Sequence, residues 1–160
     1  MSIEHIEHIE HIRQATPADA NRIAEIEVFN YRLNFYPIFK NDKFYFGELQ
    51  VNGKAEKLLA DGKALQKTYV YDDGAVKGFA VIDGGEVKKL FVEPVLQGQS
   101  IGAELLEYAK EVHGANYLWA LEKNTRAIRF YEKHGFCATE ERIPEEGTAE
   151  YLVKMRKTDR

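Results

Sequence analysis

A shortage of cysteine, of long apolar runs and of surplus basic charge limits what this chain of 160 residues can be. Its one cysteine, Cys137, excludes an intramolecular disulfide and a zinc site built from cysteines, so neither an oxidising compartment nor a metal-stapled fold is expected. The apolar runs are short of the roughly 20 residues that cross a bilayer, and no apolar stretch follows a basic start. We therefore predict a cytoplasmic protein with no membrane partner.

The sequence also lacks a basic face or tail. Its 22 lysine and arginine residues stand against 26 aspartate and glutamate residues, which gives a formal net charge of −4. A dedicated nucleic-acid binder needs basic charge to neutralise phosphates, so we predict no nucleic-acid partner. What the sequence has is apolar material, with 44% hydrophobic residues, nine Phe and nine Tyr. This composition at this length predicts a single domain over residues 1–160.

The opening residues repeat His-Ile-Glu and contain His5, His8 and His11, three of the five histidines. A spacing of three fits neither a strand nor a helix face, so regular structure would not bring the three imidazoles together. A metal-binding or pH-sensing arm is one interpretation. We predict the other, a loose extension over 1–8 that leads into the first strand, and we expect no metal cofactor.

Periodicity and turn signals predict a mixed fold. Thr16 before Pro17 is typical of a helix start, and Gly114 and Gly135 stand where helices commonly end. Asp-Asp-Gly and Asp-Gly-Gly turns join three strands into an antiparallel meander. The predicted strands cover 9–14, 68–71, 75–82, 86–92, 116–121, 136–143 and 150–155, and the predicted helices begin at 16 and cover 54–65, 100–113 and 124–134.

Aromatic residues crowd the segment from Tyr31 to Phe46, which Pro37 and Asn41-Asp42 interrupt. We predict two short helical pieces around an irregular turn in this segment. Its rings either pack in the core or form the wall of a pocket, because aromatics supply large and rigid contact area. Composition alone favours packing.

The stretch from 87 to 103 can hold an anion. A strand leads through the turn Gln97-Gly98-Gln99-Ser100 into a helix, and the first amides of a helix are unpaired and lie at its positive dipole end. The turn lacks the Lys and Ser/Thr of a P-loop, and its glycines are spaced differently from those of the dinucleotide fingerprint. A phosphate site and a plain turn are both compatible with these residues.

Residues 90–102, with the sequence LFVEPVLQGQSIG, resemble the acetyl-CoA signature of the GNAT family of N-acetyltransferases. That signature is Gln or Arg, two residues, Gly, one residue, then Gly or Ala. Gln97 and Gly102 match it, whereas Ser100 stands where the family usually has glycine. If position 100 needs a positive φ, serine costs on the order of 1 kcal/mol there, although its hydroxyl can donate to a phosphate.

A second block, residues 118–136 with the sequence LWALEKNTRAIRFYEKHGF, resembles the next strand and helix of the same family. Asn124, Ala127 and the run from 130 to 133 stand at the matching spacing. The opening strand and helix are similar too, so the resemblance covers about 12–156. It implies an α/β fold of mixed α+β character, in which a central mixed, mostly antiparallel sheet of about seven strands is flanked by about four helices.

The resemblance implies direct attack of a primary amine, on a small molecule or a peptide, on the thioester of acetyl-CoA as co-substrate. Strand 90–92 would pair with the pantetheine amides and point an N–H at the oxyanion, and residues 97–103 would hold the pyrophosphate. Asn124 would cap its helix and contact the cofactor, and Tyr131 would give its proton to the departing sulfur. The cofactor-binding residues so implied are Leu90, Phe91, Val92, Gln97, Gly98, Gln99, Ser100, Ile101, Gly102, Ala103, Asn124 and Tyr131.

The general base and the acceptor stay open. Glu86 is the candidate base, with Glu122 or a chain of waters as alternatives. The acidic run over 140–150 either draws a cationic amine or is a solvated hairpin. Transfer of a different acyl group, or a sensor that binds CoA without turnover, are the alternative functions. We expect a monomer or a homodimer.

Overall fold

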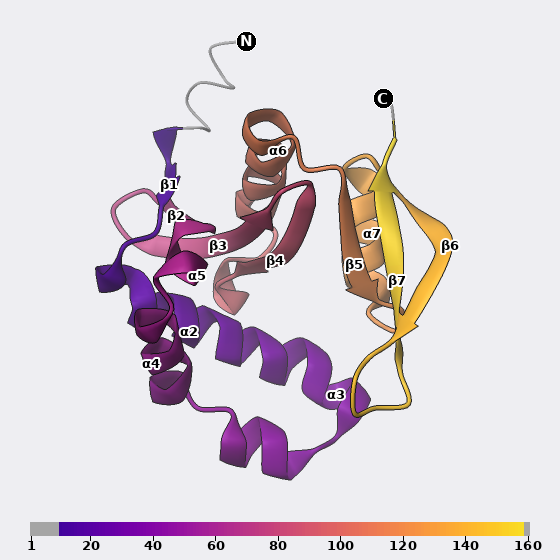
Figure 1. Cartoon of the computed structure of the whole chain (residues 1–160), viewed down its shortest axis with the longest axis horizontal. Coiled ribbons are helices and arrows are strands. Elements are labelled where there is room, and N and C mark those ends of the chain that lie inside the picture. The colour runs from indigo at the N-terminus through magenta and orange to yellow at the C-terminus, as the bar shows by residue number, and fades with distance from the viewer. Residues whose placement is uncertain (1–9, 159–160) are drawn as a thin grey trace.

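A seven-stranded sheet organises the chain, and the computed structural model describes residues 10–158 (Figure 1). The strands lie in the order β1-β2-β3-β4-β5-β7-β6, and β4 and β5 run parallel whereas the other neighbouring pairs are antiparallel. The predicted number of strands and their mostly antiparallel arrangement are thereby confirmed. The strands are β1 (Ile12–Gln14), β2 (Thr68–Asp72), β3 (Val76–Asp83), β4 (Glu86–Val92), β5 (Tyr117–Leu121), β6 (Phe136–Pro144) and β7 (Tyr151–Lys157).

The described residues form six α-helices rather than about four, because the predicted helical segments are broken. The segment predicted over 54–65 breaks at Asp61, whose side chain accepts from the backbone N–H groups of Lys63 and Ala64 and so caps a second helix. The α-helices are α2 (Ala20–Asn30), α3 (Tyr36–Phe39), α4 (Val51–Ala60), α5 (Gly62–Gln66), α6 (Ile101–His113) and α7 (Thr125–Lys133). Short 3₁₀ turns cover Pro17–Asp19 and Pro94–Leu96, and π-helical turns cover Tyr31–Phe35 and Lys43–Glu48.

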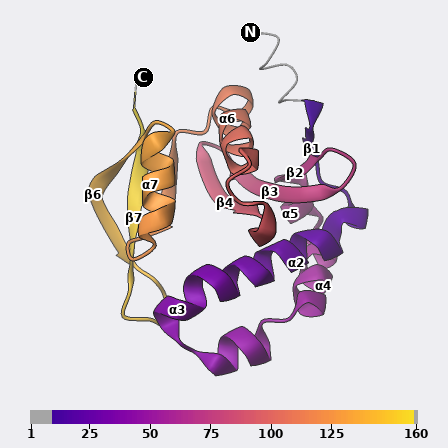
Figure 2. The same ribbon diagram turned by 180° about the vertical axis from the view of Figure 1, so that it is seen from behind.

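The two faces of the sheet bury different cores. Alternate residues of β3 point to opposite faces, so Ala80 packs in the cluster that contains Leu105 of α6, whereas Phe79 packs with Ile23 and Ile26 of α2. Figure 2 shows α6 and α7 side by side on one face of the sheet. The sheet is therefore the middle layer between α6 and α7 on one side and α2 on the other.

The predicted helix start and helix ends are confirmed. Thr16 has extended backbone dihedrals and precedes a 3₁₀ turn that continues into α2. Gly114 follows α6 with a φ of 66°, and Gly135 follows α7 with a φ of 93°. Both angles lie in the left-handed region that glycine adopts without steric cost.

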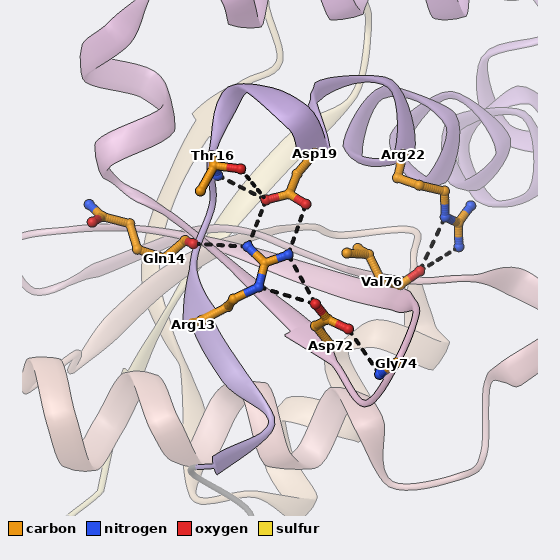
Figure 3. Close-up of polar contacts among 8 residues, drawn as sticks. All are labelled: Arg13, Gln14, Thr16, Asp19, Arg22, Asp72, Gly74 and Val76. Atoms are coloured by element: carbon orange, nitrogen blue, oxygen red, sulfur yellow. Dashed lines mark hydrogen bonds and ion pairs between the residues drawn. The ribbon is translucent and has the colours of Figure 1, made fainter.

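An arginine on β1 joins its own strand to the start of α2, six residues further on, and to the end of β2, 59 residues further on (Figure 3). The Arg13 guanidinium donates to Asp19 at 2.7 and 2.9 Å, and to Asp72 at 3.0 and 3.1 Å. Asp19 also accepts from the Thr16 N–H at 2.8 Å, and Asp72 accepts from the Gly74 N–H at 3.0 Å. Arg13 thereby fixes β1, the start of α2 and the β2–β3 turn relative to one another.

The outer strand β6 loses its register with β7 in the middle. Ala138 pairs with Met155 and Arg142 pairs with Val153, so four steps along β6 match two steps along β7. Residues 139–141 therefore form a bulge at the edge of the sheet.

The predicted extension over 1–8, with His5 and His8, lies outside the described residues. Between residues 10 and 158, no group of three His, Cys, Asp or Glu side chains could hold a metal ion. In the same range, no helix is long and apolar enough to cross a membrane.

Replacing Asp19 by Asn should lower the free energy of unfolding by about 2 kcal/mol, because Arg13 loses one of its two charged partners and keeps only Asp72. The hydrogen bonds from Arg13 hold the pKa of Asp19 below its usual value. The carboxylate's contribution is therefore complete above the unfolded pKa of about 3.9 and is lost as pH falls through the folded pKa.

Urea unfolding at neutral pH and at about pH 3 tests this linkage. The wild type should lose more stability between the two conditions than the Asp19→Asn variant does. Glu56→Gln, on the exposed side of α4, is the control and should keep the wild-type difference. Equal losses in the wild type and Asp19→Asn would mean that this ion pair does not stabilise the fold.

Candidate functional site

The parallel strands β4 and β5 pair with each other at two positions only. Glu86 pairs with Tyr117 and Val87 pairs with Leu118, although β4 continues to Val92 and β5 continues to Leu121. The strands therefore diverge toward their carboxyl ends and open the sheet in its middle (Figure 1).

A β-bulge in β4 coincides with this divergence. Val81 of β3 pairs with Lys89, whereas its neighbour Ile82 pairs with Val87. Lys88 is therefore an extra residue without a partner on β3. A bulge bends its strand, and this one bends β4 at the point where β4 leaves β5.

The diverging part of β4 presents backbone groups to the opening. The N–H of Glu93 donates to the carbonyl of Lys77, which precedes Gly78 on β3, at 2.9 Å. Because successive backbone N–H groups of a strand point to opposite sides, those of Leu90 and Val92 point away from β3 and toward β5. Within the described chain, no residue of β5 pairs with this part of β4. A ligand with amide groups can pair there as an added strand does.

The opening belongs to a cleft of about 500 Å³ that is lined by β4, β5, the start of α6, one face of α7 and the end of α2. The structure brings almost all of the predicted site residues together in its wall. Gln99 and Glu86 are the two exceptions. The predicted residues that line the cleft are Leu90, Phe91, Val92, Gln97, Gly98, Ser100, Ile101, Gly102, Ala103, Asn124 and Tyr131.

The first turn of α6 opens into this cleft. Ser100 precedes the helix with a φ of 71°, so the residue where a glycine was expected does adopt the left-handed conformation. A Cβ on Gly102 would lie 3.5 Å from the side chains of Val92 and Phe130, which shows how closely α6 approaches β4 and α7. The unpaired amides of this turn and the helix dipole have the chemistry to bind an anion at the cleft wall.

Asn30 at the end of α2 holds this arrangement together, and sequence reasoning missed it. The side chain is only 1% exposed, and its Nδ2 donates to the carbonyls of Ile26 and Val92, both at 2.8 Å. Its Oδ1 accepts from Gln97 Nε2 at 3.1 Å and from Asn34 Nδ2 at 3.3 Å. Asn30 thus joins α2 to the end of β4 and to the turn before α6. Its place on the apolar face of the helix, four residues after Ile26, was the available signal.

Helix α7 begins as predicted. Asn124 caps it, since Oδ1 accepts from the N–H of Ala127 at 3.3 Å, and its amide nitrogen remains for a ligand. Tyr131 packs edge-on against Phe130 and Phe136, with ring centroids 5.4 and 6.3 Å away. Its hydroxyl makes no hydrogen bond to any residue that the structure describes. Burial raises the pKa of Tyr131 to about 12, so the hydroxyl is protonated at neutral pH.

The aromatic segment divides between the two predicted roles. Phe35 lines the cleft together with Asn34. Tyr45 instead packs in a small core with Val28 and Leu49.

The charge in the cleft is of one sign. Between residues 10 and 158, no aspartate or glutamate lines it, whereas Lys88, Lys89, Arg126 and Lys133 do. The candidate base Glu86 lies at the closed end of β4, beside Asp83 and Tyr117, and the structure does not bring it to the cleft.

The acidic run over 140–150 also contributes nothing to the cleft wall. Glu141 forms an ion pair with Arg156 at 3.2 Å, and Glu150 forms one with Lys123 at 2.8 Å. The alternative carboxylate Glu122 is paired with Arg142 at 2.6 Å. These contacts fit the interpretation as a charged hairpin rather than as an acidic mouth.

Sequence comparisons relate part of the chain to known proteins. Residues 64–138 match the family described as "Acetyltransferase (GNAT) domain". The chain is 36% identical over 70 residues to the peptidyl-lysine N-acetyltransferase YjaB of Salmonella typhimurium, a match that covers 44% of this chain and 48% of that protein. It is 33% identical over 66 residues to the peptidyl-lysine N-acetyltransferase YiaC of Escherichia coli, covering 41% of this chain and 45% of that protein. The match spans about half the length of these curated relatives.

The fold extends further than the sequence match. A crystal structure of the PaiA N-acetyltransferase from Thermoplasma acidophilum, in complex with coenzyme A, superposes with a TM-score of 0.71 at 20% identity. The superposition covers 92% of this chain and 98% of that one. At this level of identity, the similarity establishes a shared fold.

Proposed function

We propose that the chain is a GNAT acetyltransferase, the domain that its residues 64–138 match, and that it transfers the acetyl group of acetyl-CoA to a primary amine. The observation that carries this proposal is the parting of β4 from β5 beside the N-terminus of α6. One cleft thereby offers a strand edge for the amides of pantetheine and backbone donors for the pyrophosphate. The site needs both, because the cofactor has an extended amide-bearing arm and an anionic end.

The thioester lies beside the diverging part of β4 in this proposal. The amine nitrogen attacks the thioester carbon, an N–C bond forms, and the carbonyl oxygen takes up negative charge. The N–H of Leu90, which points into the opening, donates to that oxygen. Collapse of the tetrahedral intermediate breaks the C–S bond and releases CoA as a thiolate.

Tyr131 meets the departing sulfur. A CoA thiol has a pKa near that of cysteine, about 8.5, whereas the pKa of Tyr131 is about 12, so complete proton transfer to a free thiolate is uphill by about 5 kcal/mol. The hydroxyl therefore stabilises the developing negative charge first of all as a hydrogen-bond donor. It gives its proton to the sulfur as the C–S bond breaks and recovers a proton from water.

The amine must lose one proton before it attacks, and the cleft lacks a carboxylate among the described residues to take it. Taking a charged amine out of water into the cleft disfavours its protonated form, so burial lowers the pKa of a bound acceptor. We propose that this proton passes to water rather than to Glu86.

The acceptor is the amine of a lysine side chain in a peptide, in keeping with the names of the relatives YjaB and YiaC. Phe35 and Trp119 are among the residues in the wall of the cleft. Aromatic surfaces of this kind suit the aliphatic stem of lysine, whose nitrogen can then reach the thioester.

Ligand binding and turnover test the function directly. Acetyl-CoA and CoA at about 100 times their Kd should raise the Tm by about 5–10 °C, because they bind the native state, and ATP and NAD should not. A lysine-containing peptide should gain the mass of one acetyl group. Stabilisation by ATP or NAD, with none by any CoA species, would contradict the proposal. Binding of CoA without turnover on any amine would favour the sensor alternative.

Replacing Tyr131 by Phe should lower kcat at least about 100-fold, the usual contribution of a positioned proton donor, and leave the Kd for acetyl-CoA within about twofold. Tyr108→Phe on α6, which is outside the cleft, is the matched control and should keep the wild-type kcat. A Tyr131→Phe enzyme that retains kcat within a factor of about two would rule out this role.

Replacing Glu86 by Gln tests whether water or Glu86 accepts the proton that the substrate amine loses. With water as the acceptor, kcat/KM should rise with pH toward the lysine pKa of about 10.4 in the wild type and in the variant alike. The measurement is the pH–rate profile with a lysine peptide. A flattened acidic limb in Glu86→Gln would make Glu86 the general base.

A further inference from the structure

Among the described residues, three lysines line the cleft, and the proposed acceptor is itself a lysine side chain. Lys88 and Lys89 belong to β4, and Lys133 is the last residue of α7. Lys88 stands two residues before Leu90, whose N–H is the proposed oxyanion donor. Residues two apart on a strand are separated by about 7 Å, and the four-carbon stem of a lysine reaches nearly that far. The amines of β4 are therefore within reach of the thioester.

Lys89 is held away from the reaction by a buried carboxylate. Its Nζ lies 2.6 Å from Glu27 on α2, whose side chain is only 3% exposed. Lys54 of α4 lies 3.5 Å from the same carboxylate oxygen. Taking a cation away from a buried carboxylate is costly, so Lys89 stays paired with Glu27. An ammonium group in such a pair has no lone pair with which to attack a thioester.

Lys88 is held much less tightly. It is the extra residue of the β4 bulge, and its side chain is 49% exposed. Its Nζ lies 3.3 Å from Asp83 Oδ2, and Lys67 Nζ lies 3.2 Å from the same oxygen. Two cations thus share one carboxylate at the surface, where an ion pair contributes little. Lys88 can therefore leave Asp83 at low cost and turn into the opening between β4 and β5.

We propose that the protein acetylates its own Lys88. The inference rests on the proposed function, since it applies the same chemistry to an amine of the chain itself. The Lys88 ammonium gives one proton to water, and its nitrogen then attacks the thioester carbon. An N–C bond forms, the C–S bond breaks, and the nitrogen loses a second proton to water. CoA leaves as a thiolate, which is protonated through Tyr131 as in transfer to a peptide.

Attack within one molecule gives Lys88 an advantage over exposed lysines elsewhere in the chain. A group that is held near its target reacts as if it were present at a very high concentration. Lys63 on α5 is exposed and does not line the cleft, so it can be acetylated only by the cleft of another molecule. The rate of Lys88 acetylation per molecule should therefore not depend on the protein concentration.

Mass spectrometry of the wild type, incubated with acetyl-CoA and without a peptide, measures this modification residue by residue. Lys88 should gain an acetyl group at least about 10 times faster than Lys89 or Lys63, because its attack is intramolecular and its amine is not held by a buried partner. The rate per molecule should stay constant over an about 10-fold range of protein concentration. Equal rates at Lys88 and Lys89, or a rate that rises with protein concentration, would overturn the proposal.

Two variants separate the enzymatic reaction from chemical acetylation by the thioester. Tyr131→Phe should slow acetylation of Lys88 by about the factor by which it slows transfer to a peptide. Lys88→Arg keeps a positive charge beside Asp83 and should lose the fast acetylation without passing it to Lys89. A wild-type rate at Lys88 in Tyr131→Phe would show chemical acetylation and contradict the proposal, as would fast acetylation of Lys89 in Lys88→Arg.

Transfer to a lysine peptide distinguishes this inference from the function on which it rests. A wild type that acetylates the peptide but leaves Lys88 unmodified overturns self-acetylation and leaves the proposed function standing. A wild type that binds acetyl-CoA and acetylates neither the peptide nor Lys88 overturns the proposed transfer activity as well.

Discussion

Everything in the cleft depends on keeping β4 away from β5 after two paired residues. Where two strands separate, their backbone N–H and C=O groups lose their hydrogen-bond partners. A folded protein tolerates this only where water or a ligand forms those hydrogen bonds instead. Helix α2 supports β4 on the other side at several points. Glu27 contacts Lys89 at 2.6 Å, Asn30 donates to the Val92 carbonyl at 2.8 Å, and Arg22 contacts Glu93 at 2.9 Å. Burial alone would raise the pKa of Glu27, but Lys89 and Lys54 outweigh it and lower that pKa.

Much of the fold and of the site could be predicted because the signals are local. The glycines after α6 and α7 and the cap at Asn124 each act within a few residues of their own position. Asn30 could not be predicted in this way, because its partners Val92 and Gln97 are more than sixty residues away in sequence. Glu86 was misleading for the opposite reason. It is the first residue of β4, where β4 still pairs with β5, whereas the residues of β4 that line the cleft are Val87 to Val92.

The net charge of the chain does not reveal the charge of the residues that line the cleft. The composition gives a net charge of −4 and no basic stretch, yet the described wall of the cleft contains four cations and no carboxylate. These cations come from β4 and from α7, which are separated by α6 and β5, so only the folded chain collects them. The cleft therefore attracts an anionic cofactor in a protein whose surface as a whole repels anions.

The bulge in β6 and the acidic residues on it disfavour pairing of this edge strand with another chain. A strand at the rim of a sheet offers its free backbone groups to any other chain, and long flat rims invite edge-to-edge aggregation. Here residues 139–141 interrupt the regular pairing of β6, and the exposed Glu140 places negative charge at the bulge. An incoming strand would meet both a gap in the hydrogen-bond pattern and a charge to desolvate. The sheet is thus closed to further growth at one end while it stays open in the middle.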